Sequence, residues 1–170
     1  MLIFMPGDMD YSIRSVKPSD RDQVVAIFNH FVSNSFAAYP DVKVGPEFFA
    51  SLQTRSEGLP FLVIEIDQQV IGFGLLGRYH QSAAFQSTGV LTYFILPQYT
   101  RFGLGTALLN RLAAKAKMRD ISHLLAHISS RNEQSLEFHR KHGFSECGRF
   151  KGIGKKFSQS FDVVWVQKEI

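Results

Sequence analysis

Apolar and polar residues alternate, or recur at helical spacing, along most of the chain, and the two patterns predict short strands and helices. Residues 11–16 alternate, as the residues of a half-buried strand do. Pro18 opens a helix whose apolar residues recur three and four positions apart, and residues 45–47 open a shorter one. Their apolar faces hold Val24, Val25, Phe28, Phe31 and Val32 in the first helix and Phe48, Phe49 and Leu52 in the second.

Further strands are predicted in the middle of the chain. Residues 61–66 and 70–76 are rich in β-branched and aromatic side chains, and the polar residues between them predict a hairpin. Residues 88–96 have the same character and end at Pro97, which closes the strand.

The last third continues with a long helix after residues 101–105, because apolar residues recur four apart from Leu104. The remaining elements are a strand at 122–129, a helix at 132–142, and strands at 144–150 and 161–166. The predicted order is β-α-α-β-β-β-α-β-α-β-β. It indicates an α/β (α+β) fold, in which helices cover both faces of a mixed sheet.

Composition fits a globular protein, since 45% of the 170 residues are hydrophobic and 20% are charged. We expect one domain over residues 11–170, preceded by an N-terminal extension at residues 1–10. The apolar run of that extension is too short for a signal peptide, and no stretch approaches a membrane span. The one cysteine, Cys147, permits neither an intrachain disulfide nor a cysteine-based metal site. A cytoplasmic protein is therefore expected.

The formal charge of +4 comes chiefly from the second half of the chain. A basic surface can serve nucleic acid or a phosphorylated ligand, or it can simply be solvated. The sequence contains no nucleic-acid-binding motif, so we expect neither a nucleic acid nor a membrane as a partner.

The most informative segment is residues 91–107, where a strand runs into a loop that carries Gly103 and Gly105 at the start of a helix. Glycines let a ligand approach the main chain closely, and free amides at a helix N-terminus suit a pyrophosphate. Arg101 adds a cation beside them. The segment is not a P-loop, because no Gly-Lys-Ser/Thr follows. It fits a dinucleotide-binding fingerprint poorly, because Leu108 stands where the third glycine belongs.

Several segments share a pattern with one known family. Residues 101–109, preceded by Pro97, resemble an acetyl-CoA loop of the form Gln/Arg-x-x-Gly-x-Gly/Ala, although Thr100 departs at its first position. Residues 132–144 are similar to N-E-x-S-…-L-H-x-K-x-G-F. Further matches are residues 28–32 with Tyr39 near the start, and residues 154–157 with 162–163 at the end. Together the chain resembles the GNAT superfamily of acetyltransferases, and more narrowly its phosphinothricin acetyltransferase-like branch.

The resemblance implies acetyl-CoA as co-substrate, no metal, and a mostly antiparallel sheet that splays beside the strand before the glycine turn. The pantetheine arm is expected in that gap. Relatives of this type are often homodimers, and the sequence leaves open whether this chain forms one. The implied cofactor-binding residues are Tyr93, Phe94 and Ile95 through main-chain groups, Arg101, Phe102, Gly103, Leu104, Gly105 and Thr106 around the pyrophosphate, and Asn132 and Ser135 along the arm.

Acyl transfer to an amine needs a neutral amine, a donor to the oxyanion, and a proton for the departing thiolate. The resemblance assigns the oxyanion donor to the main chain of Phe94 or Ile95. His139 stands where this branch carries a histidine and many superfamily members carry a tyrosine general acid. A histidine there can protonate the thiolate, or it can merely bond the sulfur or a carbonyl group.

Val90 departs from the branch, which usually has a glutamate at this position as the base. Valine cannot accept a proton. Either another residue is the base, or a water chain suffices, or the amine differs from the amino-acid analogues of the branch. His80 and His127 are the candidate replacements.

The substrate end is expected to be apolar and aromatic, although most of the 16 phenylalanines must belong to the core. Arg78 can supply a positive charge for an anionic analogue. The candidate substrate-binding residues are Phe28, Phe31, Tyr39, Arg78 and Phe85.

These residues predict an N-acetyltransferase that moves an acetyl group from acetyl-CoA to the amine of a small molecule. The expected acceptor is an amino acid or an analogue such as phosphinothricin or methionine sulfone, acetylated by direct transfer in a ternary complex. Cys147 lies far along the chain from the cofactor loop, so no acyl-enzyme is expected. The alternative is an acyl-CoA-binding module with weak or lost catalysis.

Overall fold

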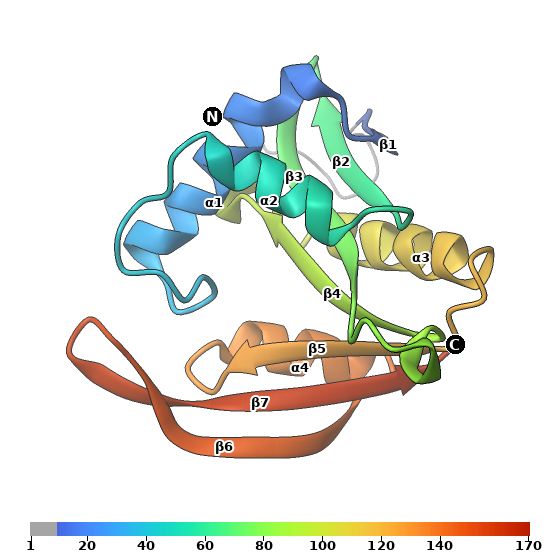
Figure 1. The fold of residues 1–170 in the computed structure, drawn as a ribbon. Helices are drawn as coiled ribbons and strands as arrows, with labels where there is room; N and C mark the ends of the chain where they lie inside the picture. The colour runs from blue at the N-terminus through green and yellow to red at the C-terminus, as the bar shows by residue number, and fades with distance from the viewer. Residues whose placement is uncertain (1–9) are drawn as a thin grey trace.

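The computed structural model describes residues 10–170, so the predicted N-terminal extension lies outside it apart from Asp10. Within this range seven strands form one sheet in the order β1-β2-β3-β4-β5-β7-β6 (Figure 1). Neighbouring strands are antiparallel except β4 and β5, which are parallel. The strands are β1 (Ser12–Ser15), β2 (Phe61–Ile66), β3 (Gln69–Arg78), β4 (Thr88–Ile95), β5 (His123–Ser129), β6 (Ser145–Lys156) and β7 (Gln159–Glu169).

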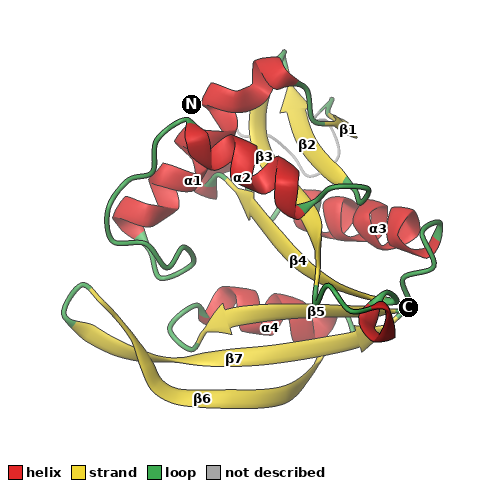
Figure 2. Ribbon diagram, in the orientation of Figure 1, coloured by secondary structure: helices red, strands yellow, loops and turns green. Residues whose placement is uncertain are grey.

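Helices cover both faces of the sheet, as the sequence predicts (Figure 2). Helices α1 (Arg21–Asn34) and α2 (Glu47–Arg55) pack their buried aromatic and aliphatic residues on one face. Helices α3 (Leu104–Lys117) and α4 (Glu133–Lys141) lie on the other. No helix of residues 10–170 is long and apolar enough to cross a membrane.

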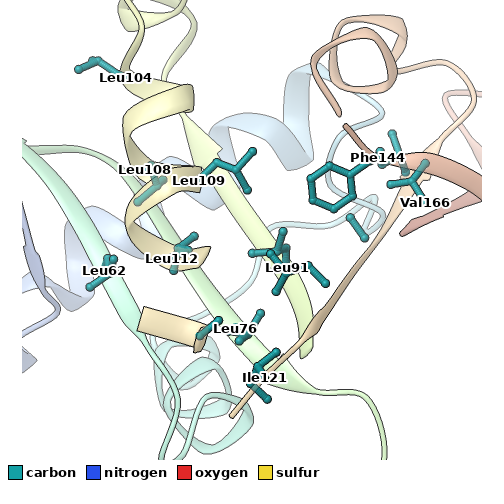
Figure 3. Packing of buried hydrophobic residues seen from close by; sticks show 14 of the residues in the cluster. Leu62, Leu76, Leu91, Leu104, Leu108, Leu109, Leu112, Ile121, Phe144 and Val166 are labelled. Atoms are coloured by element: carbon teal, nitrogen blue, oxygen red, sulfur yellow. The ribbon is translucent and has the colours of Figure 1, made fainter. Parts of the chain in front are cut away.

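The core beneath α3 explains why that helix begins where it does. Leu104, Leu108 and Leu112 are at most 1% exposed and belong to the same buried cluster as Leu62 and Leu76 of the sheet (Figure 3). Their spacing of four residues puts them on one side of the helix. This packing holds the first turn of α3, and therefore the glycine loop before it, at a set position on the sheet.

Strands β6 and β7 are longer than the hydrophobic pattern predicts. Most residues of β6 are exposed, because it is an edge strand with only β7 beside it. Its lysines and glycines therefore show no alternation, and main-chain pairing with β7 defines the strand instead. The pairing is irregular between Phe150 and Gly154.

Strands β4 and β5 separate part of the way along their length. They pair only at Thr88, Gly89 and Val90 of β4, which oppose residues 123–125 of β5. Strand β4 then continues to Ile95 and remains paired with β3 on its other edge. Figure 1 shows the two strands close together near the C-terminus and diverging from there. The divergence leaves one edge of β4 without a strand partner and confirms the predicted splay.

Candidate active site

The free edge of β4 presents main-chain groups of alternate residues to the gap. Leu96, just after β4, donates its N–H to the carbonyl of Ile71 in β3 at 3.0 Å. Amides of successive strand residues point to opposite edges, so Tyr93 and Ile95 direct their N–H and C=O groups away from β3. The amide of Phe94 therefore faces β3. The main chain of Phe94, predicted to bond the cofactor or the oxyanion, is therefore turned toward β3 and away from the gap, although the residue lines the adjacent groove.

The glycine loop also carries free donors. Gly103 caps α3 with a φ of 83°, and the first amide of this region with a main-chain acceptor is that of Ala107, which bonds the Gly103 carbonyl at 3.0 Å. Within residues 10–170, no protein group accepts a hydrogen bond from the amides of residues 101–106. These amides surround the positive end of the helix dipole, which favours an anion. Thr100 uses its hydroxyl inside the loop, where it donates to the Pro97 carbonyl at 2.7 Å.

A groove of about 710 Å³ connects the free edge of β4 with this loop. Two predicted cofactor residues do not line it, because the side chains of Phe102 and Leu104 pack into the core instead. Leu104 is only 1% exposed and can offer a ligand its main chain alone. The predicted residues that line the groove are Tyr93, Phe94, Ile95, Arg101, Gly103, Gly105, Thr106, Asn132 and Ser135.

The local geometry favours glycine at both loop positions, for different reasons. Gly103 has open space around it, but its positive φ disfavours any side chain. At Gly105 a Cβ would lie 3.3 Å from the ring of Phe138, across the groove. Arg101 tolerates a φ of 68°, a conformation that costs a non-glycine residue about 1–2 kcal/mol. The loop therefore keeps its amides exposed at some conformational cost, as a pyrophosphate-binding loop needs.

A smaller chamber of about 190 Å³ adjoins the groove at the splay. Helices α1 and α2, the loop after α1, and strands β4 and β5 form its walls. The two cavities meet at residues common to both linings, which are Ala37, Tyr93, Phe94, Asn132 and Ser135. Asn132 is also the N-cap of α4, because its side chain accepts the Ser135 amide at 3.2 Å.

Tyr93 and His139 form a hydrogen-bonded pair at this junction. His139 is 2% exposed, and its Nδ1 lies 2.7 Å from the Ser135 carbonyl, which can only accept. Nδ1 therefore carries the hydrogen, and in the neutral ring Nε2 accepts from the Tyr93 hydroxyl at 2.7 Å. Burial lowers the pKa of His139 and raises that of Tyr93, so both groups are neutral at pH 7.

A second pair, Tyr39 and His127, lines the chamber. The Tyr39 hydroxyl lies 3.0 Å from Nδ1 of His127. Burial, and secondarily the positive charge of Arg55, lower the pKa of His127. Burial also raises the pKa of Tyr39 to about 12. His127 is therefore an uncharged imidazole that can accept a proton inside the chamber.

The other candidate base lies elsewhere. His80 is exposed, accepts the Ser82 amide at 3.0 Å, and lines neither cavity. Val90 is 6% exposed and belongs to the last paired position of β4 and β5. Of the two proposed replacements, the structure thus places only His127 in the lining of the chamber.

The predicted substrate residues separate into two groups. Phe28 and Tyr39 line the chamber, and Phe31 lines the groove. Arg78 and Phe85 line neither, so the structure does not bring them together with the other three. Arg78 is exposed at the end of β3, and Phe85 is 41% exposed beside Tyr79 and His80.

Two site features escaped the sequence patterns. The hydroxyl of Tyr93 points to His139, whereas the family pattern drew attention only to the Tyr93 main chain. Arg55 lines the chamber from the end of α2, although it belongs to no motif. The one sequence signal for Arg55 was its position at the end of a helix whose apolar face packs on the sheet.

Comparisons with known proteins agree with this geometry. The model of the acetyltransferase (GNAT) family matches residues 24–144. The L-amino acid N-acyltransferase MnaT of Escherichia coli (strain K12) is 29% identical over 161 residues, which cover 94% of this chain and 94% of that protein. The phosphinothricin N-acetyltransferase of Alcaligenes faecalis is 28% identical over 165 residues, which cover 94% of this chain and 82% of that protein.

A solved structure adds a bound cofactor to the comparison. It is yncA, described as a putative acetyltransferase from Salmonella typhimurium with its cofactor acetyl-CoA. Its sequence is 27% identical to this chain, and the two structures superpose with a TM-score of 0.85. The match covers 94% of this chain and 93% of the yncA chain.

Proposed function

The chain belongs to the acetyltransferase (GNAT) family, and from that premise we propose that it transfers the acetyl group of acetyl-CoA to the amine of a small molecule. The acceptor is an amino acid or an amino-acid analogue such as phosphinothricin or methionine sulfone. The observation that carries the proposal is the junction of two cavities at the splay, one lined by the glycine loop and the other by neutral His127.

Residues of the groove fit the cofactor. The free amides of residues 101–106 bind the pyrophosphate, and Arg101 adds a positive charge. Main-chain groups of Tyr93 and Ile95 bond the amides of the pantetheine arm, which extends the sheet at the free edge of β4. When bound there, acetyl-CoA supplies an activated acetyl group at the mouth of the chamber.

Two groups, one in the groove and one at the junction, act on the thioester. The Ile95 N–H faces the gap and donates to the oxygen on which negative charge develops during transfer. Tyr93 lines both cavities, and its hydroxyl donates its proton to the departing sulfur when it turns from Nε2 of His139 toward the groove. His139 lies behind that hydroxyl and accepts its hydrogen before and after transfer, and solvent returns the proton to Tyr93 once CoA has left.

His127 replaces the missing carboxylate as the base. In the tautomer that donates from Nδ1 to the Tyr39 oxygen, Nε2 is free to accept the proton of the acceptor amine. The lowered pKa of His127 keeps Nε2 unprotonated at neutral pH. Transfer is direct, in a ternary complex, since Cys147 is exposed on β6 and lines neither cavity.

A turnover screen tests the function. Thiol release from acetyl-CoA is measured with amino acids, methionine sulfone, methionine sulfoximine, phosphinothricin and polyamines. Acetylation of at least one amino acid or analogue is expected. Saturable acetyl-CoA binding without turnover on any amine would favour the rival function, an acyl-CoA-binding module with weak or lost catalysis.

A further inference from the structure

The side chain of Arg55 lies over strand β3 and forms part of the wall of the chamber. Arg55 is the last residue of α2, and its stem packs on Gly77 of β3. A Cβ at Gly77 would lie 3.0 Å from both Cγ and Nε of Arg55, so a side chain there would displace the arginine. Because Gly77 has no side chain, the side chain of Arg55 can cross β3 at this residue and line the chamber.

The guanidinium of Arg55 has no anionic partner among residues 10–170. No ion pair of this range includes it, and burial lowers its pKa with no carboxylate to oppose the effect. Arg14 behaves in the opposite way, because its bonds to Asp20 and Glu65 raise its pKa. Arg55 is exposed to solvent on one side and lines the chamber on the other, and an arginine without a carboxylate partner in such a place is a ready site for an anion.

The chamber around Arg55 is short of negative charge. Its titratable side chains are Arg55, Tyr39, Tyr93, His127 and His139, and no acidic residue of the described range lines it. An acceptor whose only charge is an ammonium is repelled by the guanidinium, whereas an acceptor that also carries an acid group can neutralise it. The volume of about 190 Å³ exceeds the ~150 Å³ at which an engineered protein cavity binds benzene, so the chamber suits a small molecule.

We propose that Arg55 binds the carboxylate of the acceptor, and that the chamber thereby selects amino acids over amines without an acid group. This inference rests on the proposed function, because it names the acceptor class of the same site. The planar guanidinium offers two parallel N–H donors to the two carboxylate oxygens. In an α-amino acid a single carbon separates the carboxyl group from the amine, so an acid held by Arg55 keeps the amine within the chamber that His127 lines.

Binding calorimetry in the presence of CoA tests the inference without relying on turnover. The probes are L-methionine sulfone and L-phenylalanine, each compared with its carboxamide. The wild-type protein is expected to bind the acids about 10- to 100-fold more tightly than the carboxamides, the range of a charge-assisted hydrogen bond. R55M should lose this preference, and R55K should keep part of it.

The matched control is R111M, because Arg111 is exposed on α3 and lines neither cavity. It should keep the full preference for the acids. R55M should retain the wild-type affinity for acetyl-CoA, which shows that it is folded. Equal binding of acids and carboxamides by the wild type, or an unchanged preference in R55M, would overturn the inference. Arg55-dependent binding of the acids without acetylation would instead overturn the proposed function and leave the carboxylate site in place.

Discussion

The hydroxyl of Tyr93 lies 2.7 Å from Nε2 of His139, although 46 residues separate the two in the chain. Tyr93 belongs to β4 and His139 to α4, so their contact joins the free edge of the splayed strand to the helix behind it. The rings are also nearly parallel, with centroids 5.6 Å apart. The contact holds the Tyr93 side chain where groove and chamber meet.

Removal of the Tyr93 hydroxyl should slow the chemical step. Y93F is expected to lower kcat about 100-fold, the lower range for loss of a general acid, with the KM for acetyl-CoA nearly unchanged. H139A should also lower kcat more than it raises that KM, because Tyr93 loses its acceptor. H139N should recover part of the rate, since its amide can still accept from Tyr93. Steady-state kinetics measure both constants, and wild-type kcat in Y93F would contradict the assignment.

The pH dependence of turnover should report His127. A base must be unprotonated, and burial lowers the pKa of His127 below the ordinary value of 6.5. Activity is therefore expected to be lost as the pH falls through that lowered pKa, so the midpoint of the acidic limb of kcat should lie below pH 6.5. H127Q should lower kcat at neutral pH and abolish this acidic limb.

His80 provides the control for the pH profile, since it is exposed and lies outside both cavities. H80Q should reproduce the wild-type profile. An acidic limb that persists in H127Q would assign the base to another group or to water.

Side chains in the glycine loop should prevent acetyl-CoA binding. G103V places a β-branched residue at a φ of 83°, and G105V directs its side chain toward Phe138 across the groove. Both variants are expected to lose measurable acetyl-CoA binding in calorimetry. G148V is the matched control, because a Cβ at Gly148 meets no atom within 4 Å and the residue lies on the edge strand β6. Unchanged affinity in both loop variants would place the pyrophosphate elsewhere.

Lys156 should stabilise the wall between groove and chamber. The side chain is buried, and Nζ donates to the carbonyls of Ser35 at 2.7 Å and Ala38 at 2.6 Å. K156M leaves these acceptors without their donor and is expected to lower the free energy of unfolding by about 2 kcal/mol. Urea denaturation measures the change. The exposed neighbour gives the control K155M, which should unfold like the wild type.

Residues 35–38 also connect this stability to function, because Ser35 and Ala37 line the groove and Ala37 and Ala38 line the chamber. K156M should therefore raise the KM for the acceptor as well. Full stability in K156M would show that the segment holds its position without the ammonium group.

Local patterns in the sequence determined the order of the elements and the cofactor loop. Strand β2 spans residues 61–66, as the β-rich run predicts, and α3 begins directly after Gly103. Hydrophobic periodicity and glycine placement act over a few residues, so they can be read without the fold. The same reasoning failed for β6, where exposed lysines and glycines hide the strand and pairing with β7 defines it.

The set of residues that line the chamber depends on the tertiary structure alone. Arg55, Tyr39 and His127 come from α2, from the loop after α1 and from β5, and no spacing along the chain links them. The direction of the Phe94 amide likewise depends on which edge of β4 pairs with β3. A sequence pattern states which side chains are apolar and where the backbone can turn. Which polar groups face one cavity depends on how strands separate and helices cross, and long-range packing sets that geometry.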